Sequence, residues 1–293
     1  MEKTPYMHIP IHLTGFFQPY YTEDPLSTGS VGAGLILTPG IRLEIRQAER
    51  RAAKLNGAPV NIGPVNHVLQ NLPPLEVDIE SPLQPGVGFS LSAATTLGLT
   101  LLTSHLTGLT PLAAAQAAHV AEVKSMTGLG DVTAIYEGNG LAVRVKPGAP
   151  GIGEVLSLPV PKDVGVIASS LGYMDTGTML VKYADKIRKY GGWAFKRFFK
   201  NPCFENFVET AEEFSKKVGF MNASIRETIT PIRSKLMGAV VKKRVLFTIA
   251  DINDILEVFT YLKQKLGSAY YFNISDAEWK RAIYQEAILG TSR

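Results

Sequence analysis

The sequence predicts an α+β fold made of two lobes. The chain has 293 residues, and at roughly 150 residues per domain that length suggests two domains. Segments with strand and helix patterns are mixed along the chain, which favours an α+β arrangement. The proline- and glycine-rich segment Lys146–Gly153 has the composition of a linker. We therefore expect a border within 147–162, with one domain at 1–155 and the other at 156–293.

Apolar periodicity assigns the individual elements, because alternation indicates strands and a spacing of three or four residues indicates helices. In the first half it predicts a strand at 35–37, a strand at 75–80, a helix from beyond 90 to 108, a helix from 110 to about 125, and a hairpin with strands at 132–136 and 141–145. In the second half it predicts strands at 164–169, 245–250 and 269–274, and helices at about 178–189, 205–218, 223–237, 251–266 and 276–289. Thr110 and Asp251 are the expected caps of their helices.

Composition excludes several classes of protein. A hydrophobic fraction of 45% with 19% charged residues is typical of a globular chain with a real core. A net charge of +4 is too small to indicate a nucleic-acid partner. Cys203 is the only cysteine, so an internal disulfide and a cysteine-rich zinc site are both impossible. No apolar run reaches about 18 residues and the first residues do not resemble a signal peptide, so we expect a cytoplasmic protein with no membrane partner.

A glycine-rich loop at 85–94 lies between a predicted strand and a predicted helix. The first turn of a helix exposes unpaired N–H groups and a partial positive charge, so a loop of small residues there can wrap a phosphate. Gly86 and Gly88 would let the backbone approach the anion, and the hydroxyls of Ser90 and Ser92 could contact oxygen or Mg²⁺. The loop is neither a P-loop nor a Rossmann fingerprint. An ordinary Gly/Ser turn with an N-cap serine is the alternative interpretation.

Two carboxylates follow this loop in the chain. His119 and Glu122 share one face of an alanine-rich helix, and the turn Thr127–Gly130 then leads to Asp131 at the start of a predicted strand. This pair suits phosphoryl transfer, in which one carboxylate binds Mg²⁺ and the other orients or deprotonates the attacking hydroxyl. A surface glutamate and a turn aspartate are the alternative.

These segments together resemble the GHMP kinases, whose second motif reads Pro-x-Gly-x-Gly-Leu-Gly-Ser-Ser-Ala. The residues that match are Pro85, Gly86, Gly88, Ser92 and Ala93, while Phe89, Ser90 and Leu91 replace leucine, glycine and serine. Glu122 and Asp131 match the order and approximate spacing of that family's acidic pair. The departures at Ser90 and Leu91 affect the expected phosphate contacts rather than the presence of the loop.

The resemblance implies a fold, cofactors and roles. The fold would have a ribosomal-S5-like N-terminal lobe and a ferredoxin-like C-terminal α/β sandwich, with ATP in the cleft between them. ATP and Mg²⁺ would be the cofactors, Asp131 the catalytic residue, and Ser92 and Glu122 the metal ligands. The nucleotide-binding loop would consist of Pro85, Gly86, Val87, Gly88, Phe89, Ser90, Leu91, Ser92 and Ala93.

The N-terminal segment narrows the resemblance. Pro10–Phe17, Asp24-Pro25 and the expected Gly/Ser loop Gly29–Gly34 are similar to the archaeal pantoate kinases, a GHMP branch in coenzyme A synthesis. The turn 128–132 and the segment 171–176 are similar to that branch as well. This implies phosphorylation of the primary hydroxyl of (R)-pantoate to 4-phosphopantoate, in a homodimer. Other functions remain open: a GHMP kinase for homoserine or mevalonate, or a non-catalytic relative that binds a nucleotide or nucleic acid.

A hydroxy acid needs a cation for its carboxylate. Arg144, on the return strand of the predicted hairpin, would lie opposite Ala134 and roughly 10 Å from Asp131, and a guanidinium grips a carboxylate well. By resemblance, Ser30 and His119 also line the pantoate site, and Thr176 is a further candidate. The alternatives are a solvated strand arginine, a surface histidine and a turn serine. His12 is interpreted as a structural hydrogen-bonding residue at a strand end.

Two basic segments are interpreted as solvated surfaces. The stretch 182–200 interleaves lysines and arginines with aromatic residues, a composition that single-strand nucleic-acid surfaces also use. The favoured interpretation is a solvated helix face whose aromatic residues are buried, so we expect no nucleic-acid partner. Lys242-Lys243-Arg244 is likewise expected to be a solvated helix end.

Overall fold

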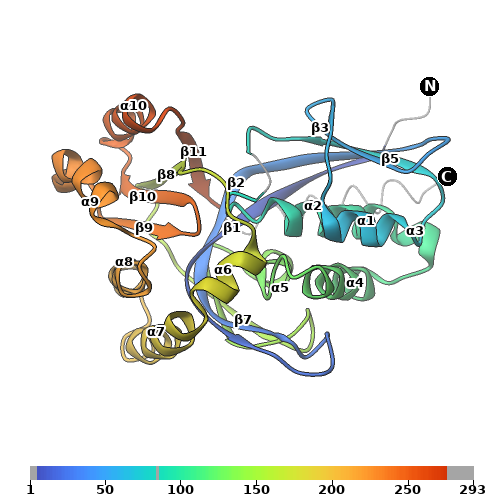
Figure 1. Ribbon diagram of the computed structural model, residues 1–293, viewed down its shortest axis with the longest axis horizontal. Helices are drawn as coiled ribbons and strands as arrows, with labels where there is room; N and C mark the ends of the chain where they lie inside the picture. Colours follow the sequence, from blue (N-terminus) through green and yellow to red (C-terminus); the bar gives the residue numbers. More distant parts are fainter. Residues whose placement is uncertain (1–4, 84–85, 276–293) are drawn as a thin grey trace.

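The computed structural model describes residues 5–83 and 86–275, which form two lobes around one curled sheet (Figure 1). The strands are β1 Tyr6–Tyr20, β2 Gly29–Gln47, β3 Ala52–Leu55, β4 Ala58–Pro59, β5 Leu75–Glu80, β6 Leu141–Lys146, β7 Glu154–Leu158, β8 Val164–Ser170, β9 Gly238–Lys242, β10 Val245–Asp251 and β11 Tyr270–Ile274. The helices are α1 Gly63–Leu69, α2 Leu91–Leu102, α3 Ser104–Thr107, α4 Pro111–Lys124, α5 Asp131–Glu137, α6 Thr176–Lys182, α7 Ala184–Phe198, α8 Phe204–Val218, α9 Ala223–Ile229 and α10 Ile255–Leu266, with a 3₁₀ helix at Thr230–Lys235.

Two long antiparallel strands, β1 and β2, run through the middle of the molecule. Strand β2 also pairs with β5 and β6, which belong to the N-terminal lobe. Strand β11 pairs with β2 on one side and with β8 on the other, and β8 continues to β10 and β9. The strands of both lobes are therefore linked by main-chain hydrogen bonds.

Helices cover the two ends of this sheet (Figure 1). In the N-terminal lobe α1, α2, α4 and α5 pack together, and α2 and α5 also contact β1. In the other lobe α7 and α8 pack against each other and against β1. The ring of Phe16 on β1 lies 5.6 Å from that of Phe198 on α7 and 6.2 Å from that of Phe207 on α8. The basic aromatic stretch thus buries its apolar side within the fold, as the sequence predicts.

Several elements have the predicted bounds. The strand at Leu75–Glu80 and the helix at Phe204–Val218 agree with the prediction within one residue, whereas the helix that begins after Ser90 ends at Leu102 instead of 108 and the short helix α3 follows it. Thr110 caps α4, and its hydroxyl accepts a hydrogen bond from the Ala113 amide over 3.2 Å. Among the described residues, no helix is long and apolar enough to span a bilayer.

The predicted hairpin at 132–145 is wrong in its first half. Asp131–Glu137 forms the short helix α5, in which the Ala134 amide donates to Gly130 O and the Gly138 amide to Ala134 O. Val132, Thr133 and Ile135 favour strands by their side chains, but packing against α2 and α4 buries them in a helix. Asp131 consequently begins a helix rather than a strand.

Four other predictions are corrected. The segment Gly29–Gly34, expected as a loop, is the beginning of β2. The helix expected to end at 237 ends earlier, and residues 238–242 form β9. Asp251 ends β10, and α10 begins after Asp254 instead. The helix expected at 178–189 is two helices, α6 and α7, and α1 was not predicted.

Three predictions are not decided by these elements. Strand β7 lies across the predicted border at 155–156 and pairs with β6, and the division into domains at that point stays a prediction. Pro85 and the closing helix predicted at 276–289 lie outside the described residues.

Candidate active site

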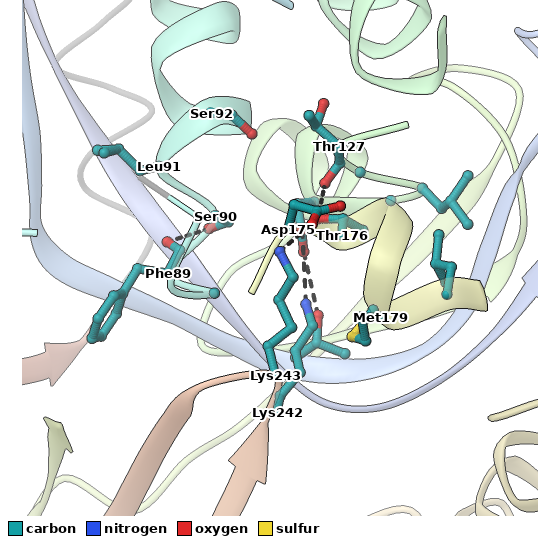
Figure 2. A pocket seen from close by; sticks show the side chains of 18 of the residues that line it. Phe89, Ser90, Leu91, Ser92, Thr127, Asp175, Thr176, Met179, Lys242 and Lys243 are labelled. Atoms are coloured by element: carbon teal, nitrogen blue, oxygen red, sulfur yellow. Dashed lines mark hydrogen bonds and ion pairs between the residues drawn. The ribbon is translucent and has the colours of Figure 1, made fainter. Parts of the chain in front are cut away.

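A cavity of about 430 Å³ lies where the loop 86–92, the turn 127–131, helix α6 and the β9–β10 turn meet (Figure 2). The predicted site residues that line it are Gly86, Gly88, Phe89, Ser90, Leu91, Ser92, Asp131, Arg144, Ser30 and Thr176. The fold thus brings to one cavity most of the residues that the sequence singled out. Glu122, His119, Val87 and Ala93 do not line it.

The loop before α2 has the backbone that a phosphate cradle needs. Gly86 and Gly88 have φ angles of 76° and 126°, which residues with side chains rarely adopt. The side chains of Val87, Phe89, Leu91 and Ala93 are buried in the core. The Phe89 ring packs edge-on against that of Tyr270 on β11, with 5.8 Å between centroids, and so anchors the loop. The loop therefore holds a fixed shape.

Ser90 departs from the family motif, in which a glycine occupies this position. Its φ of 53° is left-handed, which explains why glycine suits the position. The Ser90 hydroxyl donates to Phe89 O over 2.7 Å and accepts a hydrogen bond from the His12 amide over 2.8 Å. The serine thus connects the loop to β1, a contact that glycine could not make.

The first turn of α2 is open to an anion. It contains no acidic residue, and the first intrahelical bond of the turn is that from the Ala94 amide to Ser90 O, at 3.0 Å. The preceding amides have no partner within a helix and carry the positive end of its dipole. The Ser92 hydroxyl lies on the same turn and faces the cavity (Figure 2). This geometry suits a polyphosphate.

Glu122 lies behind the cavity wall, next to Ser92. It is 2% exposed, Oε2 accepts a hydrogen bond from Ser92 Oγ over 3.2 Å, and the buried Oε1 has no hydrogen-bond partner among the described residues. Burial raises the pKa of this carboxyl to about 7. A Cβ at Gly128 would lie 2.6 Å from Glu122 Oε2 and 3.8 Å from Asp131 Oδ2. The glycine thus leaves room for both carboxylates to approach one point.

Asp131 is connected to a buried histidine and arginine. His12 Nδ1 lies 2.7 Å from Asp131 Oδ1, and His12 Nε2 lies 3.2 Å from Arg144 Nη1. A guanidinium can only donate, so His12 Nε2 must be the acceptor and Nδ1 must carry the proton. Burial lowers the pKa of His12 to about 4, so the imidazole is neutral at neutral pH. Hydrogen bonds therefore run from Arg144 through His12 to Asp131.

The carboxyl of Asp131 is ionised throughout the physiological range. Burial alone would raise its pKa, but Lys242, His12 and Arg144 together outweigh burial and hold the pKa well below its usual value. Lys242 Nζ lies 3.9 Å from Asp131 Oδ2, and Thr14 Oγ1 donates to Oδ1 over 3.3 Å. A carboxylate with so low a pKa is a weak base and a strong hydrogen-bond acceptor.

Arg144 lies closer to Asp131 than the sequence predicted, and for a different reason. Because 131–137 is helical, Arg144 is not opposite Ala134; it pairs with Gly32 on β2 and Val155 on β7. A Cβ at Gly130 would lie 2.7 Å from Ser30 Oγ and 2.8 Å from Arg144 Nε, so Ser30 and Arg144 flank the same turn. Arg144 is 2% exposed and its Nε has no hydrogen-bond partner among the described residues.

The two other predicted substrate residues differ in placement. Thr176 begins α6 and lines the cavity, and its hydroxyl donates to Thr127 O over 2.8 Å. His119 is buried behind the wall, where Nε2 lies 2.9 Å from Thr28 O and Nδ1 lies 3.4 Å from Thr133 Oγ1. Burial lowers its pKa. The structure thus joins His119 to the start of β2, near Ser30, and its direct contact with a substrate stays a prediction.

Sequence reasoning missed several residues of the wall, among them two lysines, Thr14 and Tyr173. Lys242 and Lys243 were predicted to lie on a solvated helix end, which is wrong: they end β9 and begin the β9–β10 turn, and both line the cavity. Thr14 on β1 also lines it, as does Tyr173, whose ring lies over Gly86. Thr14 and Tyr173 lie in segments that resemble the pantoate kinases, whereas no motif marks the two lysines, whose position depends on a contact between distant segments. The apolar run Gly238–Val241 directly before the lysines was the available signal.

Comparisons with known proteins identify the family of this chain. Residues 45–139 match the family model described as the GHMP kinases N terminal domain. A pantoate kinase from Thermococcus kodakarensis is 36% identical over 234 residues, covering 75% of this chain and 77% of that protein. A pantoate kinase from Methanocaldococcus jannaschii is 30% identical over 227 residues, covering 75% and 82%.

Solved structures give the same result for the fold. A protein titled "Phosphotransferase related to CoA biosynthesis pathway" superposes with a TM-score of 0.81 at 30% identity, covering 92% of this chain and 95% of that one. The mevalonate kinase of Methanococcus jannaschii superposes with a TM-score of 0.63 at 14% identity, covering 94% and 99%, and shows the fold alone. The chain therefore belongs to the pantoate kinase branch of the GHMP kinases.

Proposed function

We propose that this protein transfers the γ-phosphoryl group of ATP to the primary hydroxyl of (R)-pantoate, giving 4-phosphopantoate for coenzyme A biosynthesis. The observation that carries the proposal is the composition of one cavity. Open amides at the start of α2, an ionised aspartate and a buried arginine with a free N–H all face it. An ATP phosphate, an acceptor hydroxyl and a carboxylate are the three groups that such walls would bind.

The donor binds at the loop 86–92. The amides of the first turn of α2 hold the phosphates, since a helix N-terminus favours negative charge and the glycines allow close approach. The ring of Tyr173 and the backbone at 60–63 border the same cavity, so the nucleoside part extends toward them. Most of the binding energy of ATP therefore comes from backbone atoms, which the buried side chains of the loop keep in place.

Mg²⁺ completes the donor site, and the protein's oxygens fit this cation. Glu122 offers a buried carboxylate oxygen without a partner, and Ser92 Oγ lies between Glu122 and the cavity. A Mg²⁺ ion is usually held by one or two carboxylates together with substrate phosphates and water. The ion would neutralise charge on the phosphates. It would also favour the ionised form of Glu122, whose pKa burial raises to about 7.

Asp131 orients the acceptor hydroxyl rather than removing its proton early. Its pKa is far below neutral, so it cannot hold a proton for long, but as a carboxylate it accepts a strong hydrogen bond. In the loose transition state of phosphoryl transfer the hydroxyl keeps its proton until the new bond has largely formed. Asp131 therefore contributes chiefly by aiming the hydroxyl oxygen at phosphorus and by receiving the proton late.

Arg144 and Ser30 hold the acid. Arg144 is fixed by its bond to His12, which leaves Nε and part of the guanidinium for a carboxylate. Ser30 Oγ lies beside the same guanidinium across Gly130, where it would bind a substrate oxygen. Since Arg144 and Asp131 are both bonded to His12, the carboxylate and the primary hydroxyl of a short acid fit between them. Thr176 and His119 are proposed to contribute from the far wall and from behind Ser30.

An acceptor panel tests this proposal. The protein is incubated with ATP, Mg²⁺ and either pantoate, mevalonate or homoserine, and the product is identified by ³¹P NMR. We expect 4-phosphopantoate, while phosphorylation of mevalonate without pantoate would overturn the substrate. Asp131→Asn should lower kcat by at least about 10²-fold with ATP binding retained. The matched control is Asp163→Asn, an exposed aspartate outside the cavity, which should behave like the wild type.

The resemblance also leads us to infer a homodimer in the cytoplasm. Cys203 is a free cysteine, which suits a reducing compartment. Light scattering of the purified protein measures the subunit number, and a mass near that of one 31.8 kDa chain would contradict the dimer.

A further inference from the structure

Two lysines from the second lobe enter the cavity beside the phosphate loop. Lys242 ends β9, and Lys243 follows it in the turn to β10. This turn packs directly on the loop: a Cβ at Gly88 would lie 3.4 Å from both Lys242 O and Lys243 Cδ. The Arg244 amide donates to Val87 O over 3.4 Å. The second lobe therefore places both lysines in the cavity that the loop before α2 also lines (Figure 2).

Lys243 crosses the cavity from the loop to helix α6. Its Nζ donates to Thr176 Oγ1 over 2.6 Å, and no carboxylate of the described residues forms an ion pair with it. Burial and the neighbouring Lys242 lower its pKa to about 8, although Asp131, Glu122 and Asp175 partly oppose this. A single hydroxyl is a poor counterpart for a largely buried ammonium group, which has three donors.

The ammonium group of Lys242 has even fewer hydrogen-bond partners than that of Lys243. Its side chain is 12% exposed, and Nζ lies 3.9 Å from Asp131 Oδ2, which is too far for a hydrogen bond. The ammonium also lies 5.8 Å from the centre of the Phe17 ring. Burial lowers the pKa of Lys242, while Asp131 raises it. Among the described residues, no hydrogen bond uses this Nζ, so its donors point into the cavity without an acceptor.

The charges of the wall do not balance. Arg144, Lys242 and Lys243 line the cavity with two carboxylates, those of Asp131 and the exposed Asp175, while Glu122 lies behind the wall with a pKa that burial raises to about 7. Buried cations without acceptors are costly, and an anionic ligand that brings several oxygens removes that cost. Arg144 is bonded to His12 through Nη1, and its free Nε is proposed to hold the carboxylate of the acid, so the cations left for phosphate are the two lysines. Phosphate oxygens suit a lysine, which acts as a compact point charge.

We propose that Lys242 and Lys243 bind the phosphate groups that react. Lys243, whose side chain passes close to Gly88 in the phosphate loop, holds the terminal phosphates of the donor. Lys242, whose ammonium group lies near Asp131, neutralises negative charge on the phosphoryl group while that group moves to the acceptor. This rests on the proposed function. The bond from the γ-phosphorus to the bridging oxygen breaks, its electron pair leaves with ADP, a bond to the acceptor oxygen forms, and the hydroxyl proton passes through Asp131 to solvent.

The two roles predict different kinetics. Lys243→Met should raise KM for ATP by about tenfold, because it removes a ground-state contact. Lys242→Met should lower kcat by about 10²-fold with KM for ATP within about threefold, because its contact strengthens only as charge develops. Lys243→Arg keeps the charge and should recover most of the affinity. The matched control is Arg244→Met, which loses the same charge from the same turn outside the cavity and should stay within about threefold of the wild type.

Tripolyphosphate, a donor without nucleoside or acceptor, separates this inference from the proposed function. Calorimetry should show that the wild-type protein binds it and that Lys243→Met binds it about tenfold more weakly. If the wild type phosphorylates no acceptor yet Lys243→Met loses tripolyphosphate, the function fails and the phosphate site stands. If the wild type is active and both lysine variants match Arg244→Met, the lysine inference is overturned.

If the lysine variants fail to fold, a protection experiment on the wild-type protein tests the inference instead. An amine-reactive reagent is applied near pH 8, and modification is followed by peptide mass spectrometry. ATP or tripolyphosphate should slow modification at Lys242 and Lys243 and leave the exposed Lys200 unchanged. Equal rates with and without phosphate at both cavity lysines would overturn the inference.

Discussion

His12 Nδ1 donates a hydrogen bond to Asp131 Oδ1 over 2.7 Å, and the His12 main chain also bonds the phosphate loop. One residue of β1 thus holds both the carboxylate that is proposed to receive the acceptor hydroxyl and the loop that is proposed to bind the donor. Its other ring nitrogen accepts from Arg144, which is proposed to hold the acid. His12 does not line the cavity, so its part in the reaction is to position other residues.

Replacing this histidine should lower activity through Asp131. In His12→Asn the bond to Asp131 is lost and the pKa of Asp131 rises, so the acid limb of the kcat profile moves to higher pH. We expect kcat to fall by about 10- to 100-fold. His8→Asn, an exposed position on the same strand, is the control. An unchanged acid limb in His12→Asn would contradict this role.

The buried carboxyl of Glu122 should lower the free energy of unfolding at neutral pH. Burial raises its folded-state pKa to about 7 from an ordinary 4.5, so the folded protein holds this proton more tightly than the unfolded chain. The free energy of unfolding is therefore highest below the pKa of the unfolded state. It falls by roughly 3 kcal/mol in all as the pH rises through the pKa of the folded state. Without ligand, Glu122→Gln should be more stable than the wild type near pH 8 and equal to it near pH 4.

Denaturant unfolding at the two pH values checks this, with the exposed Glu205→Gln as control. The same Glu122→Gln variant should need more Mg²⁺ for half-maximal turnover, since an amide binds the cation weakly. A variant that is no more stable than the wild type near pH 8 would show that the buried carboxyl is not ionised there.

Gly130 should be needed for binding the acid. In Gly130→Ala the new Cβ would lie 2.7 Å from Ser30 Oγ and 2.8 Å from Arg144 Nε, so both side chains must shift. Its φ of 173° is extended backbone, so the effect comes from crowding and not from strain. We expect KM for pantoate to rise by about tenfold and stability to fall by about 1–3 kcal/mol. A rise in KM for ATP with no change in KM for pantoate would contradict a role of Gly130 in binding the acid.

Loss of the proton from Lys243 should make kcat/KM for ATP decline at alkaline pH. Its pKa of about 8 means that the ammonium loses its proton above that pH, and with it the attraction to phosphate. The value of kcat/KM for ATP in the wild type should therefore decline above about pH 8. In Lys243→Arg the guanidinium stays charged and the decline should move to higher pH. An identical alkaline limb in both proteins would assign it to another group.

Local patterns were enough to predict the donor side of the site. The apolar spacing after Ser90 defines α2, and Thr110 with Pro111 defines the start of α4, because caps and periodicity act within one or two turns. These two helices place Ser92 and Glu122, the two expected metal ligands, side by side. The loop resembles a known motif for the same reason: its shape follows from glycines in sequence.

Long-range packing decided what the sequence could not show. Helix α5 forms despite its β-branched residues because α2 and α4 surround it, and this moves Arg144 to a different partner strand. Lys242 and Lys243 could equally have ended a solvated helix, and only the docking of the β9–β10 turn on Gly88 turns them inward. Gly88 and the two lysines are more than a hundred positions apart in the chain, and for such a contact one sequence holds no local signal.

Strand β11 limits how the enzyme can open. Asn273 and Ile274 pair with Thr38 and Leu37 on β2, and the Ser275 amide donates to Ile36 O over 2.8 Å. A hinge that swung the lobes apart at this edge would break a ladder whose bonds are each worth about 1 kcal/mol net. The residues from both lobes that line the cavity are thus held in place by main-chain pairing between the lobes.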